Sequence, residues 1–572
     1  MALAASILVL DADSVAGLAV VQSLGAAGYA CILGATTNDA PAFASRYAHG
    51  QALYPDPLKD AEAFKDWLRG WLRAHDVSLI IPTTECTLGP LAAMRDEPEV
   101  AGKAALHPPA ALETALDKEK LRRLAAELGV PTPASAYVQR VEELEDPHIA
   151  GWLAQGGVVV KATVSKAWNG ARAYEFPTKI APDGDELRRL VAARVRHVPV
   201  QVQEWMPGHG VGIELLAHQG EIVLHIAHER LHEVPLTGGG SSYRRTIEPP
   251  PAVYGDAQKL ARALGLHGVA MVEFRFDPAS GRHWLMEINM RFWGSLPLAA
   301  FAGVDFPRAL ADMLIGGRVP VQPHVRLGVT ARNVSRDLEW MKLVRKRRGQ
   351  ATRFELTRPL GRSLLEWSRV LTGRETWDGA RLADPAPFGR ELQRLVRKET
   401  RTIKGKLEKA IALKRAPAQT AARRAQFASA THVLVLCHGN ICRSPYVAAR
   451  LAEHPVPGRE IRSAGFYREP NRPTPDDVQQ VARRRGVDLS AHRSRVVTEA
   501  DLAWADAILL MDHRNHVSLA EAGRHHLGKV LWMGALDGRD VEIDDPYGTS
   551  DAEIEAVLAR LDACTAALSN RA

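Results

Sequence analysis

The stretch VLVLCHGNICRSP, residues 433–445, constrains the fold of this chain more than any other feature. An apolar run typical of a buried strand leads into a short loop, and the following residues YVAARLAEH predict a helix. A loop of this length between a strand and a helix can turn its backbone N–H groups toward three phosphate oxygens, while the helix N-terminus adds positive potential. The stretch therefore predicts an α/β domain with an anion site at this loop.

The polar side chains of this loop suit chemistry on a phosphate group. Cys437 and Arg443 are separated by five residues. The positive potential of the loop is expected to favour the thiolate form of Cys437, which can act as a nucleophile. Arg443 offers a planar fork that can hold two phosphate oxygens. Gly439 gives the backbone room to turn, and Ser444 is placed to hydrogen-bond the thiolate when it becomes the leaving group.

The loop resembles the signature of the low-molecular-weight protein tyrosine phosphatases, and the resemblance covers residues 431–572. An alternative is a buried core thiol at Cys437 and a turn carboxylate at Asp545. Against it, four motifs occur in the order and at the distances of that family. After the loop come RSAG at 462–465, GVDLSAHRSRVVTEADLAWADAILLMD at 486–512 and DDPYG at 544–548.

The resemblance implies the roles of individual residues. Asp545 is the expected general acid: it protonates the leaving oxygen while Cys437 forms a cysteinyl-phosphate, and it then activates water. No metal is needed in this domain. Cys442 corresponds to a second loop cysteine that can form a reversible disulfide with an oxidised Cys437. The phosphate- and substrate-binding residues that the resemblance implies are His438, Gly439, Asn440, Ile441, Cys442 and Tyr547.

The substrate of this domain is less well defined. The branch of the family that acts on phosphoarginine tends to have Thr where this chain has Ile441, which favours phosphotyrosine. Residues 466–468, after the RSAG motif, are FYR and lack the tryptophan that many relatives use as a pocket wall. Either Tyr547 and Tyr467 replace that wall, or the substrate is not phosphotyrosine.

A second group of polar residues lies in MVEFRF (271–276) and MEINMRF (286–292). Strand alternation places Glu287 and Asn289 on one face, and Glu273 can join them from a neighbouring strand. Three oxygen ligands together with ATP phosphates would suit magnesium, although a pair of acidic surface residues is the simpler alternative. Arg291 continues the same face toward the phosphates or an acyl group.

These stretches resemble the ATP-grasp enzymes, particularly the carbamoyl-phosphate-synthase-like ligases, over about residues 1–325. The resemblance implies ATP with Mg²⁺ or Mn²⁺ as cofactors. It also implies that a carboxylate is phosphorylated and that an amine then displaces the phosphate. Arg244, in a Gly-rich cover, is expected near the reacting groups. Gly210 occupies the position of a ribose-binding Glu in many relatives, so Glu214 is the substitute. The ATP-binding residues implied are Lys118, Lys161, Gln203, Glu204, Met206 and Glu214.

The length of 572 residues predicts three or four domains at about 150 residues each. The expected fold class is multidomain, α/β and α+β. We expect a single amphipathic helix over 113–130 and antiparallel strands over 157–289. The predicted segments are a pre-ATP-grasp α/β domain (1–112), an ATP-grasp domain (113–325), a basic helical segment and linker (326–428), and a flavodoxin-like phosphatase domain with a central parallel sheet (429–572).

The positive charge is concentrated in one segment. Residues 331–430 contain 25 Lys and Arg against 10 Asp and Glu, a local net charge of +15, whereas the whole chain has +7. A solvated helical spacer is the first interpretation, and a peripheral membrane contact is the second, because Trp340 and Trp367 lie beside Lys and Arg. Nucleic acid ranks last. No signal peptide or spanning segment is evident, and five cysteines without a zinc spacing predict reduced thiols in a cytosolic protein.

These patterns predict a bifunctional enzyme, an ATP-grasp ligase of small carboxylates and amines joined to a phosphatase. The phosphatase would act on a tyrosine-phosphorylated partner. In one alternative the two sites are consecutive, and the phosphatase hydrolyses a small phosphate ester from the ligase pathway. In another, the ATP-grasp half only senses nucleotide, although the complete set Glu273, Glu287 and Asn289 argues against that reading.

Overall fold

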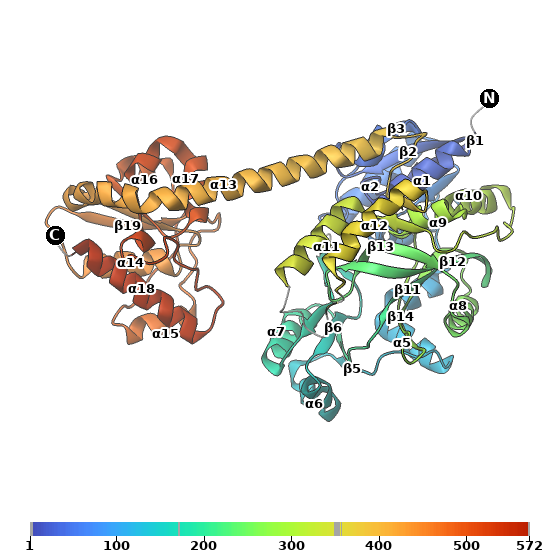
Figure 1. The fold of residues 1–572 in the computed structure, drawn as a ribbon, viewed down its shortest axis with the longest axis horizontal. Coiled ribbons are helices and arrows are strands. Elements are labelled where there is room, and N and C mark those ends of the chain that lie inside the picture. The colour runs from blue at the N-terminus through green and yellow to red at the C-terminus, as the bar shows by residue number, and fades with distance from the viewer. Residues whose placement is uncertain (1–3, 170–171, 348–354, 356, 570–572) are drawn as a thin grey trace. The chain divides into compact units, whose positions relative to one another are not determined.

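The computed structural model describes residues 4–169, 172–347, 355 and 357–569, so residues 348–354 and 356 of the basic segment lie outside the described residues. The chain forms two compact units, Met1–Leu395 and Val396–Ala572 (Figure 1). The boundary falls within the long helix α13 (Ala386–Ser429). The predicted basic segment is therefore divided between the units.

The first unit begins with a parallel sheet in the order β3–β2–β1–β4. Alternate side chains of β1 enter two cores, because successive residues of a strand point to opposite faces. Ile7 and Val9 pack with α1, and Leu8 packs with α2. This is the open α/β arrangement that the sequence predicts here. The elements are β1 (Ala4–Val9), α1 (Val15–Ala26), β2 (Tyr29–Ala35), β3 (Ala48–Leu53), α2 (Ala61–Ala74), β4 (Leu79–Ile81) and α3 (Glu85–Ala93).

The single helix predicted for residues 113–130 is wrong in one respect, since the structure has two helices, α4 (Pro109–Leu116) and α5 (Lys118–Glu127). Asp117 separates them in an extended conformation, and its carboxylate accepts hydrogen bonds from the backbone N–H groups of Glu119 and Lys120. Such a cap starts a new helix. Lys118 is thereby the first residue of α5.

A four-stranded sheet in the order β5–β10–β6–β9 follows, with antiparallel neighbours. Val158 and Val160 of β6 pack in one core with α6 and α7. Strand alternation therefore sends Lys161 to the opposite face. The elements are β5 (Ser135–Val138), α6 (Pro147–Ala154), β6 (Val158–Ala162), β9 (Lys179–Ala181), α7 (Gly184–Val195), β10 (Val200–Gln203) and the hairpin β7 (Lys166–Asn169) and β8 (Arg172–Glu175).

The largest sheet has seven strands in the order β15–β14–β11–β12–β13–β16–β17. All neighbours are antiparallel except β16 and β17. The strands are β11 (His209–His218), β12 (Glu221–Val234), β13 (Gly240–Ile247), β14 (Gly268–Asp277), β15 (Arg282–Asn289), β16 (Thr330–Arg332) and β17 (Glu375–Trp377), and the helices around them are α8 (Pro251–Ala263), α9 (Leu296–Ala302) and α10 (Phe306–Gly316).

The description of residues 331–430 as helical is corrected by β16 and β17, which extend this sheet. Arg332 of β16 is fully buried and forms ion pairs with Asp337 and Glu375. Trp340 of α11 (Val334–Lys346) is also fully buried and stacks on His232 with ring centroids 3.6 Å apart. This tryptophan, which suggested an interfacial helix, belongs to the interior. None of the described helices combines the length and apolar character needed to cross a bilayer.

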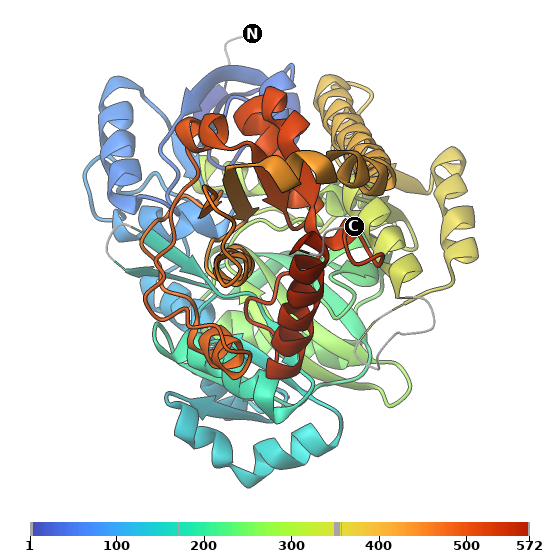
Figure 2. The same cartoon turned by 90° about the vertical axis from the view of Figure 1, so that its left-hand side faces the viewer.

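The second unit contains a parallel sheet in the order β19–β18–β20–β21. Val433 and Val435 of β18 pack with α14, α15 and α18, whereas Leu434 and Leu436 enter a core on the other face. The long α18 is drawn in dark red in Figure 2. The elements are β18 (His432–Cys437), α14 (Arg443–Ala452), β19 (Glu460–Gly465), α15 (Asp476–Arg484), α16 (Glu499–Trp504), β20 (Ala507–Leu510), α17 (His513–Gly523), β21 (Val530–Trp532) and α18 (Asp551–Ser569).

The last turns of α13 are part of this second unit. Ala416 and Phe427 are buried in its cores. Thr420 Oγ1 accepts a hydrogen bond from the backbone N–H of Trp532 at 3.1 Å, and Arg423 donates to the carbonyl of Val530 at 2.8 Å. The last turns of α13 therefore pack against the parallel sheet of this unit, and the helix does not serve only as a linker.

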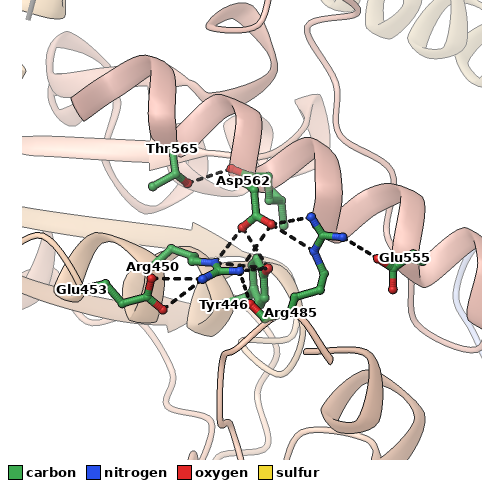
Figure 3. A network of polar contacts seen from close by, with 8 residues as sticks. Tyr446, Arg450, Glu453, Arg485, Glu555, Asp562 and Thr565 are labelled. Carbon is green, nitrogen blue, oxygen red and sulfur yellow. Dashed lines mark hydrogen bonds and ion pairs between the residues drawn. The ribbon is translucent and has the colours of Figure 1, made fainter. Parts of the chain in front are cut away.

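A polar network fixes α14 against α18 (Figure 3). Asp562 of α18 accepts hydrogen bonds from Tyr446 at 2.9 Å and from Arg450 Nε at 2.7 Å, both on α14. Arg485 donates to the same carboxylate at 2.6 Å. Because α14 begins at Arg443, this network holds the helix whose first turn carries the predicted phosphate ligands.

Candidate functional sites

The first unit contains a cavity of about 430 Å³ between its antiparallel sheets. Strands and loops that are distant in the sequence contribute charged side chains of both signs. The charged residues that line it are Lys161, Glu204, Arg230, Glu233, Glu273, Arg275, Glu287, Arg291, Arg336 and Asp378. A cavity with this lining can hold a polyanion together with a cation.

The three residues predicted to hold a metal ion meet in this cavity. Glu273 of β14 and Glu287 of β15 are cross-strand partners. Asn289 Nδ2 lies 2.9 Å from Glu273 Oε1 and 3.5 Å from Glu287 Oε1. Two carboxylates that converge in this way fit the oxygen preference of Mg²⁺ or Mn²⁺. The amide nitrogen of Asn289 faces them here, and its oxygen would reach a metal after rotation of the amide group. Arg230 forms an ion pair with Glu273 at the same place.

Burial and neighbouring charges shift the pKa values of this group. Burial raises the pKa of Glu273. Burial also acts on Glu287, but the positive charges of Lys118 and Lys161, with those of nearby arginines, leave the pKa of Glu287 below its usual value. Burial lowers the pKa of Lys161 to about 8. Lys118 does not line the cavity, and its Nζ donates to Ser165 Oγ at 2.9 Å.

The predicted adenine hinge lies along one side of the cavity. Gln203, Glu204 and Met206 all line it. Trp205, which the sequence reasoning missed, lines it as well, and the guanidinium of Arg275 lies 5.7 Å from the centroid of its ring. The position of Trp205 within the hinge stretch QEWM could have indicated that it lines the cavity.

Two glycines of β11 explain how side chains of β12 reach the cavity. A Cβ at Gly210 would lie 2.7 Å from Cδ of Arg230, and a Cβ at Gly212 would lie 2.4 Å from Cε1 of His228. Any larger residue would displace these side chains. Both Arg230 and His228 line the cavity and were missed from the sequence, where the pattern GVG at 210–212 was their only sign.

Besides Lys118, two further predicted ligand residues do not line the cavity. Glu214 is fully buried, accepts a hydrogen bond from Ser295 Oγ at 2.5 Å and lies 3.0 Å from His228 Nδ1, so it is not available to a ribose. Arg244 is also buried and forms a two-pronged ion pair with Asp378. Asp378, and not Arg244, is one of the residues that line the cavity.

Arg291 does line the cavity, as its predicted contact with phosphates or an acyl group requires. Its Nη2 donates to Asn289 Oδ1 at 3.0 Å and to Glu85 Oε1 at 3.2 Å. The side chain therefore links the metal-ligand group to the start of α3.

In the second unit, the loop after β18 encloses the Cys437 thiol. Its Sγ lies 3.0 Å from Ser444 Oγ and accepts a hydrogen bond from the backbone N–H of Asn440 at 3.2 Å. Asn440 has a φ of 50°, the left-handed conformation that curls the loop. Its amide donates to Ser444 Oγ and Ser463 Oγ and accepts from the backbone N–H of Arg495, so the loop is fixed from three directions.

Arg443 lies between two carboxylates. Its Nη1 donates to Asp512 Oδ2 at 2.7 Å and to the carbonyl of Ile543 at 2.8 Å. Its Nη2 lies 2.9 Å from Asp545 Oδ2. Asp512 was missed from the sequence, although it is the last residue of the matching stretch 486–512. The structure thus brings Cys437, Arg443, Ser444 and Asp545 into one site.

The remaining predicted loop residues are placed around this site. His438 Nε2 accepts a hydrogen bond from Arg514 Nη2 at 3.0 Å, and the His438 ring meets that of Tyr467 edge-on with centroids 5.7 Å apart. Ile441 is buried, and Tyr547 is exposed. The carbonyl of Gly439 accepts a hydrogen bond from Arg472 at 2.7 Å, which fixes this peptide group of the loop.

Cys442 is buried beside the nucleophile, and burial raises the pKa of its thiol. All five cysteines are free thiols in the structure. The raised pKa keeps the Cys442 thiol protonated. Because both Cys437 and Cys442 are free thiols here, the reversible disulfide between them stays a prediction.

A second cavity, of about 360 Å³, adjoins the Asp545 loop. It is lined by Asp512 and Asp545 and also by Lys409 of α13, whose Nζ lies 2.6 Å from Glu542 Oε2. Glu542 in turn accepts a hydrogen bond from the backbone N–H of His513 at 3.1 Å. A helix outside the predicted phosphatase domain thus contributes to the surroundings of the candidate acid.

Two family models match the chain. Residues 432–571 match "Low molecular weight phosphotyrosine protein phosphatase", and residues 196–336 match "ATP-grasp in the biosynthetic pathway with Ter operon". The molecule is therefore an enzyme in which an ATP-grasp domain and a low molecular weight phosphotyrosine protein phosphatase domain occur in one chain. Through its second unit the chain belongs to the low molecular weight phosphotyrosine protein phosphatase family.

Individual relatives cover each part. A probable low molecular weight protein-tyrosine-phosphatase, EpsP of Ralstonia solanacearum, is 33% identical over 129 residues, which are 23% of this chain and 87% of that protein. A protein-arginine-phosphatase of Geobacillus stearothermophilus is 28% identical over 137 residues, 23% of this chain and 92% of that protein. The structure of L-amino acid ligase from Bacillus licheniformis is similar over 55% of this chain and 75% of its own, with 17% identity and a TM-score of 0.43.

Proposed function

We propose that the second unit hydrolyses phosphate monoesters with Cys437 as the nucleophile. The contact of Cys437 Sγ with Ser444 Oγ at 3.0 Å, beside an Arg443 that also pairs with Asp545, carries this proposal. Sγ attacks phosphorus and forms the S–P bond as the ester P–O bond breaks, and Asp545 gives its proton to the leaving oxygen. Asp545 then takes a proton from water, which attacks phosphorus and releases the thiolate, with Ser444 donating to it.

The favoured substrate class is phosphotyrosine. The edge-on rings of His438 and Tyr467 offer an aromatic wall beside the loop, and buried Ile441 stands where phosphoarginine phosphatases tend to have Thr. Because one relative is a protein-arginine-phosphatase, phosphoarginine is the competing substrate. Turnover of a phosphotyrosine peptide and a phosphoarginine peptide of the same sequence, compared through kcat/KM, separates the two.

For the first unit we propose a ligase that joins a small carboxylate to an amine. Glu273, Glu287 and Asn289 would hold Mg²⁺ or Mn²⁺, because the two carboxylates converge and the Asn289 amide beside them can turn its oxygen toward the same point. When bound, MgATP supplies the γ-phosphoryl group that activates the carboxylate as an acyl phosphate. Lys161 offers a positive charge to the phosphates, and Arg291 offers one to the phosphates or the acyl group.

The nucleotide base belongs, in this proposal, to the hinge. Gln203, Glu204 and Met206 present polar and apolar atoms to the cavity, and Trp205 adds an aromatic face. Lys118 acts at longer range: its charge, like that of Lys161, stabilises the carboxylate form of Glu287 and hence a metal-binding state. Glu214 and Arg244 support the cavity from behind through Ser295 and Asp378.

The two activities are independent or consecutive. If they are consecutive, the phosphatase hydrolyses a phosphorylated small molecule made or used by the ligase. Incubation of the protein with MgATP and pooled carboxylates and amines, followed by mass spectrometry, tests this with wild type and Cys437→Ser side by side. A phosphorylated product that accumulates only in the variant supports consecutive sites, whereas identical ligation products support a separate phosphoprotein substrate. If neither protein forms a ligation product or consumes ATP, the ligase proposal is wrong.

A further inference from the structure

The second unit carries a group of ligand side chains that the phosphatase chemistry does not use. Glu499 is the first residue of α16, and His525 and His526 lie in the short helical segment η4 (Arg524–Lys529) after α17. Glu499 Oε1 lies 2.8 Å from His526 Nε2 and 3.6 Å from His525 Nε2. One donor atom from each residue lies within 4.8 Å of the other two.

The local backbone leaves room for both imidazoles. A Cβ at Gly523 would lie 2.9 Å from Cδ2 of His526 and 3.1 Å from Cε1 of His525. Because Gly523 has no side chain, the imidazole rings of His525 and His526 can lie against its backbone, with their ring centroids 3.8 Å apart. A residue with a side chain at this position would force at least one ring away from Glu499.

Other contacts fix the two segments to each other without the ligand side chains. Lys529, at the end of η4, donates to the carbonyls of Leu502 and Ala503 in α16, at 3.0 and 3.2 Å. His526 is only 2% exposed, whereas His525 and Glu499 face solvent. One ligand is thus anchored in the interior, and an ion with its water molecules can reach the other two.

From this geometry we infer that Glu499, His525 and His526 form a binding site for a divalent transition-metal ion of the zinc class, with water completing the coordination. Two imidazole nitrogens and one carboxylate oxygen are ligands that zinc takes in proteins. The site shares no residue with the Cys437 loop or with the oxygen ligands of the first unit, and it does not depend on the proposed reactions.

The surroundings also set the strength of binding. Metal-ligating histidines usually donate their second ring N–H to an acceptor, and loss of that partner weakens binding about 10- to 100-fold. Nδ1 of His526 is buried and has no hydrogen-bond partner among the described residues. The site should therefore bind zinc more weakly than closed structural sites, and the ion should be exchangeable.

The test uses the full chain with Cys437→Ser and Glu287→Gln, because the thiolate and the carboxylate group of the first unit would otherwise bind metal. Titration with Co²⁺ should give a visible absorption band typical of Co²⁺ with a low coordination number. The band should saturate at one equivalent and disappear when Zn²⁺ displaces the bound Co²⁺. Adding His525→Ala, an exposed position, should abolish the band and weaken zinc binding at least tenfold in an indicator competition.

A matched control is His432→Ala. His432 is also a surface histidine of the second unit and lies 3.3 Å from a carboxylate oxygen of Asp506, but the pair has no second imidazole. This variant should retain the Co²⁺ band, and Zn²⁺ should raise the melting temperature of the control but not of the His525→Ala protein. Absence of a band in the parent protein, or equal zinc affinity with and without His525, would overturn the inference.

Discussion

The two phosphate-handling sites of this molecule are encoded in opposite ways. In the second unit, Cys437, Asn440, Arg443 and Ser444 come from one loop and the first turn of one helix. In the first unit, the cavity is assembled from segments that extend from Val15 to Asp378, many of them strands of two sheets. A local site is readable from spacing alone, whereas a dispersed site depends on strand register and on residues that make room for others.

The sites also differ in where the positive charge resides. The loop uses backbone N–H groups, a helix N-terminus and one arginine. The cavity uses long side chains, and opposite charges lie close enough to pair, as Arg230 does with Glu273. Single substitutions should therefore be most severe in the loop and graded in the cavity.

Cys437→Ser should have the largest effect. Loss of the attacking sulfur should lower hydrolysis of an aryl phosphate by at least about 10⁴-fold, because no neighbouring group can replace a nucleophile. ATP binding by the first unit should be unchanged, and both are measured on the same preparation. Cys564→Ser, a cysteine of α18 in the same unit, is the control. Loss of ATP binding in Cys437→Ser would mean that the two sites are not independent.

Asp545→Asn should come next, with a decrease of about 10²- to 10⁴-fold, the usual contribution of a general acid. The decrease should be greatest for poor leaving groups, since these need the proton most. Rates for aryl phosphates of increasing phenol pKa give this dependence as a slope. Equal slowing across the series would show that Asp545 is not the general acid. The loss of activity would then be attributed to the loss of its ion pair with Arg443.

Glu287→Gln tests the dispersed site. Removal of one charge from the metal-ligand group should lower Mg²⁺-dependent ATP use by about 10²- to 10³-fold, the scale found when one preorganised electrostatic group is deleted. Glu221→Gln, an exposed glutamate paired with Arg262, is a suitable control. ATP turnover measured against magnesium concentration checks the prediction, and unchanged turnover would place the metal elsewhere.

The sequence was sufficient to group most of the residues that the structure brings together at the local site, although not Asp512, and some of those at the dispersed site. Alternation on one strand placed Glu287 and Asn289 together, and their neighbour Glu273 followed from antiparallel pairing. Lys161 was recognisable as a lysine in a valine-rich strand. These predictions involve only one or two strands. The alternation of side chains between the two faces of a strand is sufficient to make them.

The misses have a common cause. Glu214 lies on a strand that faces the cavity region, yet Ser295 and His228 enclose it. Arg244 is neutralised by Asp378, a residue 134 positions later in the chain. The strands β16 and β17 are three residues each, too short to show a period. Contacts between distant segments, which a sequence pattern does not show, determine where Glu214 and Arg244 lie. For β16 and β17, the basic composition of the surrounding segment led to the prediction of helices.

The pH dependence of ATP binding should reveal Lys161. Its lowered pKa of about 8 means that the ammonium is charged below this pH and loses its proton as the pH rises through it. Nucleotide affinity should therefore fall above pH 8, by up to about tenfold for each further unit. Calorimetric titration with ATP between pH 6.5 and 9.5 measures this. Lys161→Gln should bind more weakly and lack the inflection, and an unchanged inflection would assign it to another group.

Lys409→Ala should have the smallest effect. This substitution tests whether helix α13 contributes to the phosphatase site. The ion pair with Glu542 is partly exposed, with 46% and 28% of the two side chains accessible, so it should contribute no more than about 1 kcal/mol. Because Glu542 also holds the first N–H of α17 and stands three residues before Asp545, kcat should fall up to about fivefold with little change in KM. Lys404→Ala, exposed on the same helix, should leave kcat unchanged. Equal values for both variants and wild type would confine the phosphatase site to residues after α13, whereas the expected decrease would make the helix part of it.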